Sequence, residues 1–180
     1  CPGIVLALPV EGRVDFDVVQ TSKKVIARIR EATPEDAPAL KDLDTMTAID
    51  SSRVECIDRW LKQDHVMVVE MADQVVGYGV FNHSFLRRPH VGMVMIHTDF
   101  RGQRLGELLL RELESLCDEF RLFATTNQTN HRMQCLLRRL GYRPGGYIHE
   151  LDPGDPELVF VRDIGIAQQT APSNGDKPPN

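Results

Sequence analysis

The sequence MVMIHTDFRGQRLGELLLRELESLC, from Met93 to Cys117, decides the fold of this chain. It begins with the alternating apolar residues Val94 and Ile96, which predict a β-strand. Leucines then recur at helical spacing, at positions 105, 108, 109, 113 and 116. The pattern predicts a strand that a short turn joins to an amphipathic helix.

The turn between this strand and this helix has the chemistry of an anion-binding site. The first turn of a helix leaves backbone N–H groups without partners and carries the positive end of the helix dipole. Glycines let a ligand come close to the backbone, and arginines add fixed positive charge. When such a turn is the only motif, the alternative interpretation is an ordinary surface helix whose arginines are solvated. We predict that a phosphate group binds to Arg101, Gly102, Gln103, Arg104, Leu105 and Gly106.

A second segment, RLFATTNQTNHRMQCLLRRLGY from Arg121 to Tyr142, again has the order strand, polar turn, helix. Together the two segments resemble the GCN5-related N-acetyltransferase (GNAT) family. The first matches the family's phosphate motif, which is Arg or Gln, two residues, Gly, one residue, and Gly or Ala. The second matches a motif in which an Asn is followed eleven residues later by Gly and an aromatic residue, here Asn130, Gly141 and Tyr142.

The resemblance implies an α/β fold with a mixed, mostly antiparallel central sheet flanked by helices. It also implies an enzyme that moves an acetyl group from the cosubstrate acetyl-coenzyme A (acetyl-CoA) directly to a primary amine of a small molecule or peptide. In the family, the strand before the phosphate turn binds the pantetheine arm through its backbone, here at Val94, Met95 and Ile96. Asn130 corresponds to the residue that hydrogen-bonds the pantetheine or a bound water; a helix N-cap is its alternative role.

Three positions depart from the family pattern. Arg104 stands where the first glycine of the phosphate motif is usual, a replacement that helical φ at this position would permit. Leu137 stands where many members have a Tyr that protonates the departing thiolate, so this chain lacks the usual general acid. Thr125 stands where ribosomal-protein alanine acetyltransferases usually have a Glu, which argues against that subfamily.

The sequence does not single out the general base. An alkylammonium has a pKa of about 10, so a base or a water chain must remove its proton before attack. Glu70 and His83 in the central strands, and Glu150 beside His149 in the last hairpin, are the candidates, and each can equally be a surface residue. No base is evident, and Leu137 stands in place of the usual general acid. An alternative therefore stays open, namely a non-catalytic domain that binds or senses acyl-CoA.

The composition of the chain limits the classes of partner that it is expected to bind. The net charge of −5 gives no basic footprint for nucleic acid, and no apolar run approaches the length that spans a membrane. Four cysteines without metal-ligand spacing predict no metal site and a reducing, cytoplasmic location. A homodimer remains open. The first residue, Cys1, suggests a fragment or a processed start.

The chain divides into three parts: an extended lead over residues 1–24, an acetyltransferase domain over 25–166, and a disordered polar tail over 167–180. Thr33 and Pro34 begin a first helix, and Ser51 or Ser52 begins a second one that ends near Gln63. Further strands are predicted at residues 25–30, 65–71, 75–82, 90–96, 121–126, 147–151 and 157–164.

Overall fold

The computed structural model describes the backbone of residues 13–20 and 23–165, and side chains from residue 26 onward. Its eight strands form one sheet in the order β1-β2-β3-β4-β5-β6-β8-β7. All neighbouring strands are antiparallel except β5 and β6. The predicted mixed, mostly antiparallel sheet is therefore confirmed. The strands are β1 (Arg13–Gln20), β2 (Lys23–Glu31), β3 (His65–Met71), β4 (Gln74–Phe85), β5 (Arg88–Ile96), β6 (Arg121–Asn127), β7 (Arg143–Ile148) and β8 (Glu157–Asp163).

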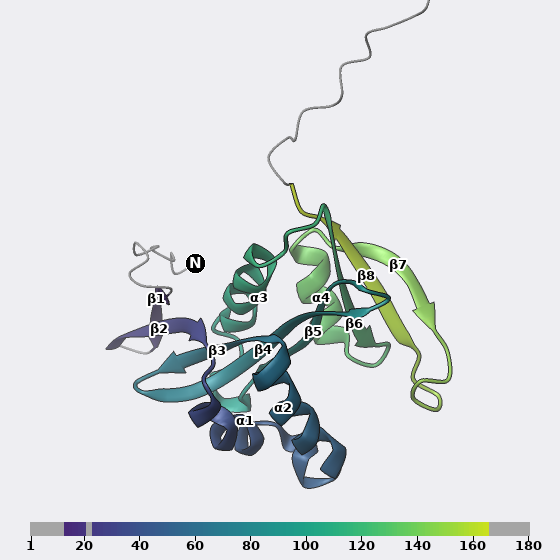
Figure 1. The fold of residues 1–180 in the computed structure, drawn as a ribbon. Helices are drawn as coiled ribbons and strands as arrows, with labels where there is room; N and C mark the ends of the chain where they lie inside the picture. Colours follow the sequence, from purple (N-terminus) through teal and green to yellow (C-terminus); the bar gives the residue numbers. More distant parts are fainter. Residues whose placement is uncertain (1–12, 21–22, 166–180) are drawn as a thin grey trace, which may run out of the picture.

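Helices cover both faces of the sheet (Figure 1). One pair packs on one face and the other pair on the opposite face, and the two pairs belong to separate apolar clusters. The helices are α1 (Ala37–Leu43), α2 (Ser51–Gln63), α3 (Leu105–Ser115) and α4 (His131–Arg139), and the short 3-10 helices are η1 (Pro34–Asp36), η2 (Thr45–Ala48) and η3 (Thr98–Phe100).

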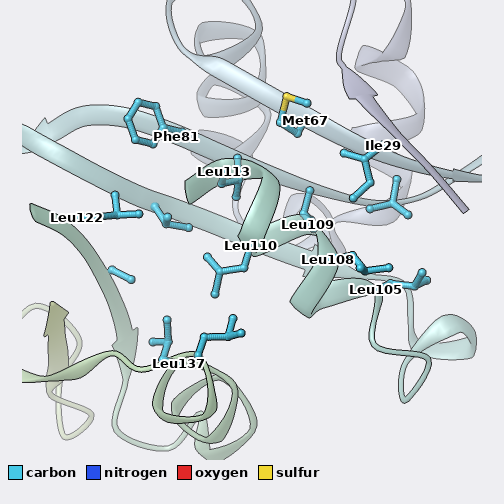
Figure 2. Close-up of a cluster of buried hydrophobic side chains, with 14 of the residues drawn as sticks. Ile29, Met67, Phe81, Leu105, Leu108, Leu109, Leu110, Leu113, Leu122 and Leu137 are labelled. Atoms are coloured by element: carbon cyan, nitrogen blue, oxygen red, sulfur yellow. The ribbon is translucent and has the colours of Figure 1, made fainter. Parts of the chain in front are cut away.

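The helix α3 owes its position to its leucines. Leu105, Leu109 and Leu113 recur at helical spacing and are buried, so they form one apolar stripe against the sheet. Gly79 of β4 lies directly beneath, because a Cβ there would meet the side chain of Leu113 at 2.7 Å. Figure 2 shows this cluster, in which Leu137 of α4 also lies. The packing fixes the start of α3 against the sheet.

The central strands β5 and β6 separate part of the way along their length. They pair at His90 with Phe123 and at Val91 with Ala124. Beyond these pairs, β5 continues beside β4 and β6 continues beside β8. A β-bulge lies at the point of separation, since Gly92 is an extra residue between the pairs that β5 makes with β4. The parting leaves one edge of each strand open to a ligand.

The structure corrects some boundaries. Part of the predicted extended lead, Arg13–Gln20, is strand β1, paired with β2 as a hairpin. The strand predicted at 147–151 runs instead over Arg143–Ile148. The helix α2 begins at Ser51 and ends at Gln63, as predicted, and Asp50 caps it by accepting a hydrogen bond from the Ser52 amide. The predicted tail at 167–180 lies outside the described residues. In the parts that are described, no helix is both long and apolar enough to cross a membrane.

Candidate functional site

A cleft of about 250 Å³ opens where β5 and β6 separate. Residues from both strands line it, together with residues from α2, α4 and β8 that approach from the two sides of the sheet. The lining residues are Arg53, Val91, Gly92, Met93, Val94, Thr125, Thr126, Asn127, Asn130, Met133 and Glu157. Residues from both faces of the sheet therefore line the same cleft.

The predicted phosphate turn follows directly from the cleft strand. The backbone N–H groups of residues 102–106 donate to no backbone oxygen among the residues described. Gly102 has φ +81 with open space around it. A Cβ added at Gly106 would lie 3.6 Å from the Leu136 side chain. Arg101 folds back, and its Nε donates to the Ile96 carbonyl at 2.9 Å. The turn presents a row of free amides at the start of an eleven-residue helix, which is suited to a phosphate.

Arg104 does not have the conformation that the sequence led us to expect. Its φ is +64 and its ψ is 8, in the left-handed region, rather than the helical φ expected for a tolerated replacement. Its guanidinium pairs with Glu107 at 3.2 Å. Arg111 and Arg139 share the same carboxylate, at 3.3 Å each. Burial alone raises the pKa of Glu107, but the hydrogen bonds from Arg104 and Arg111 hold it below its ordinary value.

The left-handed backbone at Arg104 leads to a prediction about stability. A residue with a Cβ costs about 1–2 kcal/mol in this conformation, whereas glycine adopts it freely. The exposed ion pair with Glu107 contributes about 0–1 kcal/mol. We therefore expect Arg104→Gly to raise the free energy of unfolding by about 1 kcal/mol, and Arg104→Ala to lower it. Denaturant unfolding of both variants checks this, and a glycine variant less stable than the alanine variant would contradict it.

The residues predicted to bind the cosubstrate lie along one path. Val94 lines the cleft, and Met95 and Ile96 continue the same strand to the phosphate turn. Asn130 also lines the cleft, while its Oδ1 accepts from the Met133 amide at 3.1 Å as the N-cap of α4. The two alternative roles of Asn130 are compatible, because its side-chain NH₂ is left to donate to a ligand.

None of the three predicted base candidates is among the residues that line the cleft. Glu70 accepts hydrogen bonds from Arg30, with the shorter at 2.5 Å, at the far side of β3. His83 is exposed and lies 3.7 Å from Asp118 beyond α3. Glu150 is exposed in the loop after β7 and has φ +63.

A different carboxylate does line the cleft, that of Glu157 at the start of β8. Glu157 lies opposite Asn127 in the register of β6 and β8, one diagonal step from Thr125. Burial raises the pKa of Glu157, and the Thr125 hydroxyl, which donates to the carboxylate, opposes part of this rise. Asp152 and Asp155 in the preceding loop raise the pKa further by like-charge repulsion.

Behind Thr125 lies His90, which is 7% exposed. Its Nε2 is 3.3 Å from the Thr125 hydroxyl oxygen, and its ring stacks on Phe85 with centroids 5.2 Å apart. Burial lowers the pKa of His90 to about 4, so the ring is neutral near pH 7. His90, Thr125 and Glu157 therefore lie in sequence, from the buried ring to the carboxylate that lines the cleft.

No tyrosine replaces the usual general acid in this cleft. Leu137 is fully buried in the core and does not line the cleft. Tyr142 is 3% exposed, and burial and the nearby Glu114 carboxylate raise its pKa. Tyr147 lies on β7 with 66% exposure, in edge contact with His149, and does not line the cleft.

Sequence reasoning therefore missed Glu157, His90 and Arg53. Each is a polar residue at the beginning of an element: Glu157 opens β8, His90 lies near the start of β5, and Arg53 lies in the first turn of α2. Polar residues at the starts of the two strands that flank β6 were the available signal.

Comparison with known proteins agrees with this geometry. Residues 28–142 match the acetyltransferase (GNAT) family. A putative ribosomal protein bS18-alanine N-acetyltransferase of Bacillus subtilis is 30% identical over 102 residues, which are 53% of this chain and 66% of that protein. The chain thus matches just under two thirds of the length of this relative.

Solved structures share the fold. A GNAT-family acetyltransferase of Bacillus cereus superposes with a TM-score of 0.70 at 20% identity, covering 76% of this chain and 96% of that one. A putative acetyltransferase of Salmonella typhimurium, solved with acetyl-CoA, gives a TM-score of 0.63 at 20% identity, covering 81% and 98%. At these identities the likeness concerns the fold alone.

Proposed function

The chain belongs to the GNAT family of acetyltransferases, and we propose that it transfers the acetyl group of acetyl-CoA directly to a primary amine of a small molecule or peptide. One observation carries the proposal. The cleft between β5 and β6 is lined on one side by the strand that leads to the phosphate turn, and on the other side by a half-buried carboxylate on β8. A cosubstrate and an amine can therefore meet inside it.

The cosubstrate side consists mainly of backbone. The amides of residues 102–106 would receive the pyrophosphate, because they are free of backbone partners within the described chain and lie at a helix start. The open edge of β5 from Gly92 to Ile96 would hydrogen-bond the pantetheine arm, as a further strand does. The Asn130 amide would donate to the same arm.

On the acceptor side, Glu157 is the proposed general base. A carboxylate with a raised pKa is a better proton acceptor than an ordinary one. Glu157 takes a proton from the ammonium group, and the nitrogen of the resulting uncharged amine attacks the thioester carbon. The nitrogen loses its second proton to water as the amide forms. The carbon–sulfur bond then breaks and the thiolate leaves, unassisted or with a proton from water. Desolvation in the cleft favours the uncharged amine as well.

The chain from His90 through Thr125 positions this base. The Thr125 hydroxyl oxygen lies 3.3 Å from Nε2 of His90, and the hydroxyl would orient the Glu157 carboxylate. Thr125 would thus support a carboxylate from the neighbouring strand at the position where ribosomal-protein alanine acetyltransferases usually have a Glu.

This arrangement predicts a shift in the pH profile. The base acts when it is ionised, so activity rises with pH through the pKa of Glu157. Thr125→Val removes the hydroxyl that lowers this pKa, so the rise moves to higher pH. Thr125→Ser keeps the hydroxyl and the profile of the parent.

The measurement is kcat/KM against pH with two amines of different pKa. A rise of kcat/KM that reflects ionisation of the enzyme occurs at the same pH with both amines, whereas a rise that reflects ionisation of the amine moves with the pKa of the amine. Only the rise that does not move is compared between variants. If the rise occurs at the same pH in Thr125→Val as in the parent, the hydroxyl has no role in the mechanism.

Turnover itself tests the proposed function. We expect release of free CoA from acetyl-CoA that depends on an added amine, across a panel of small amines and short peptides. The panel includes peptides with an N-terminal alanine, because a relative is named for that activity. Binding of acetyl-CoA without turnover of any amine would favour the non-catalytic domain instead. Homodimerisation and a cytoplasmic location remain predictions.

A further inference from the structure

The described residues that line the cleft include one cation and one anion, Arg53 and Glu157. Arg53 comes from the first turn of α2, on the face opposite to α3 and α4. Glu157 points to the same face, since its neighbours Leu158 and Phe160 pack into the α3 cluster. The acceptor half of the cleft is therefore dipolar.

The guanidinium of Arg53 is held in place from behind. Its Nε lies 3.6 Å from a carboxylate oxygen of Asp44, a residue with no solvent exposure. That carboxylate is itself fixed by the Tyr78 hydroxyl at 2.7 Å and the Met46 amide at 3.0 Å. The guanidinium carbon also lies 5.6 Å from the centre of the Trp60 ring. Such support lowers the entropy that the side chain loses when it binds a ligand.

The hydrogen-bond donors of Arg53 are still available. A distance of 3.6 Å is too long for a hydrogen bond, so the contact with Asp44 is ionic only. Among the residues described, the Arg53 side chain donates no hydrogen bond to another group. A guanidinium carries five N–H donors in a planar fork that matches a carboxylate. Its side chain is 25% exposed, so these donors are partly shielded from water.

We infer that Arg53 binds a carboxylate of the acceptor, and that the preferred acceptor is an amine that also carries this anionic group. The inference rests on the proposed acetyl transfer, and it names the acceptor class for that reaction. The ammonium group approaches Glu157 while the carboxylate meets Arg53. Simple cationic amines such as polyamines carry no anionic group that could pair with Arg53, so they are disfavoured.

Matched acceptors test this without knowledge of the natural one. The probes are ω-amino acids of increasing chain length, each compared with its own amide, which has the same shape and no negative charge. A second set consists of short peptides with an acidic second residue, compared with the same peptides carrying its amide. The first set represents a free amino acid and the second set a peptide, so the two sets distinguish the sources of the carboxylate.

At one or two chain lengths, or with the acidic peptides, we expect kcat/KM for the acid to exceed that for its amide by about tenfold or more. Arg53→Met should remove this preference while turnover of the amide persists, and Arg53→Lys should keep part of it. Arg59→Met is the matched control, because Arg59 is exposed on the same helix and does not line the cleft.

Calorimetry with the same probes, in the presence of CoA, keeps the test independent of catalysis. Binding of the acids that depends on Arg53, without acetyl transfer, would support the anion site and remove the proposed activity. Equal use and equal binding of acids and amides at every length would overturn the inference. So would an Arg53→Met variant that keeps the preference, or one that loses acetyl-CoA affinity instead.

Discussion

Replacement of Gly106 by Asp is expected to weaken acetyl-CoA binding by at least about a hundredfold, which corresponds to about 2.7 kcal/mol. Gly106 lies in the first turn of α3, beside the free amides of the phosphate turn. A carboxylate there lies close to the phosphate oxygens, and two like charges about 4 Å apart near a protein surface repel each other by about 4 kcal/mol. Titration calorimetry with acetyl-CoA on the folded variant measures the loss.

The control for this change is Gly106→Ala. A Cβ at position 106 would lie 3.6 Å from the Leu136 side chain and 3.8 Å from that of Ile96, which are ordinary contacts. Alanine should therefore fold and bind nearly as well as the parent. If the aspartate variant folds and binds with unchanged affinity, the pyrophosphate does not lie at this turn.

The sequence was sufficient where the interactions are local. The strand His65–Met71 has the predicted boundaries, because its apolar run ends at a tight turn. The leucine stripe of α3 and the glycine turn before it follow from helical spacing and from the chemistry of helix starts. These features place the cosubstrate side of the cleft.

Other features depend on contacts between distant segments. Glu157 enters the cleft only because β8 pairs with β6 in a register that places it beside Thr125. The φ of Arg104 is imposed by the turn, against the preference of the residue itself. Leu137 is buried because α3 and the sheet close over α4. Periodicity along the chain does not contain this information.

The same division explains why the base candidates from the sequence lie outside the lining of the cleft. Glu70 and His83 stand in central strands, where a catalytic group is plausible, but strand alternation does not tell which end of a strand is near the parting of the sheet. Their contacts with Arg30 and Asp118 place them elsewhere. The position of the cleft became defined only with the register of β5 and β6.

The change of Glu157 to Gln is expected to lower kcat by about two to four orders of magnitude, the usual contribution of a general base. Glutamine has the same shape, and its carbonyl oxygen still accepts the hydrogen bond from Thr125, so the fold and the cleft remain. Only the ability to take a proton is lost. Affinity for acetyl-CoA should stay that of the parent, since the phosphate turn is untouched.

Steady-state kinetics of four variants separate this role from a structural one. Glu70→Gln, His83→Gln and Glu150→Gln alter the residues that the sequence nominated, and all three lie outside the lining of the cleft, so each should keep kcat within about threefold, less than 1 kcal/mol. The residual activity of Glu157→Gln should rise with pH toward the pKa of the amine, because free amine then arises without a base. A Glu157→Gln enzyme with the kcat of the parent would show that water removes the proton and that the carboxylate serves only to attract the ammonium group.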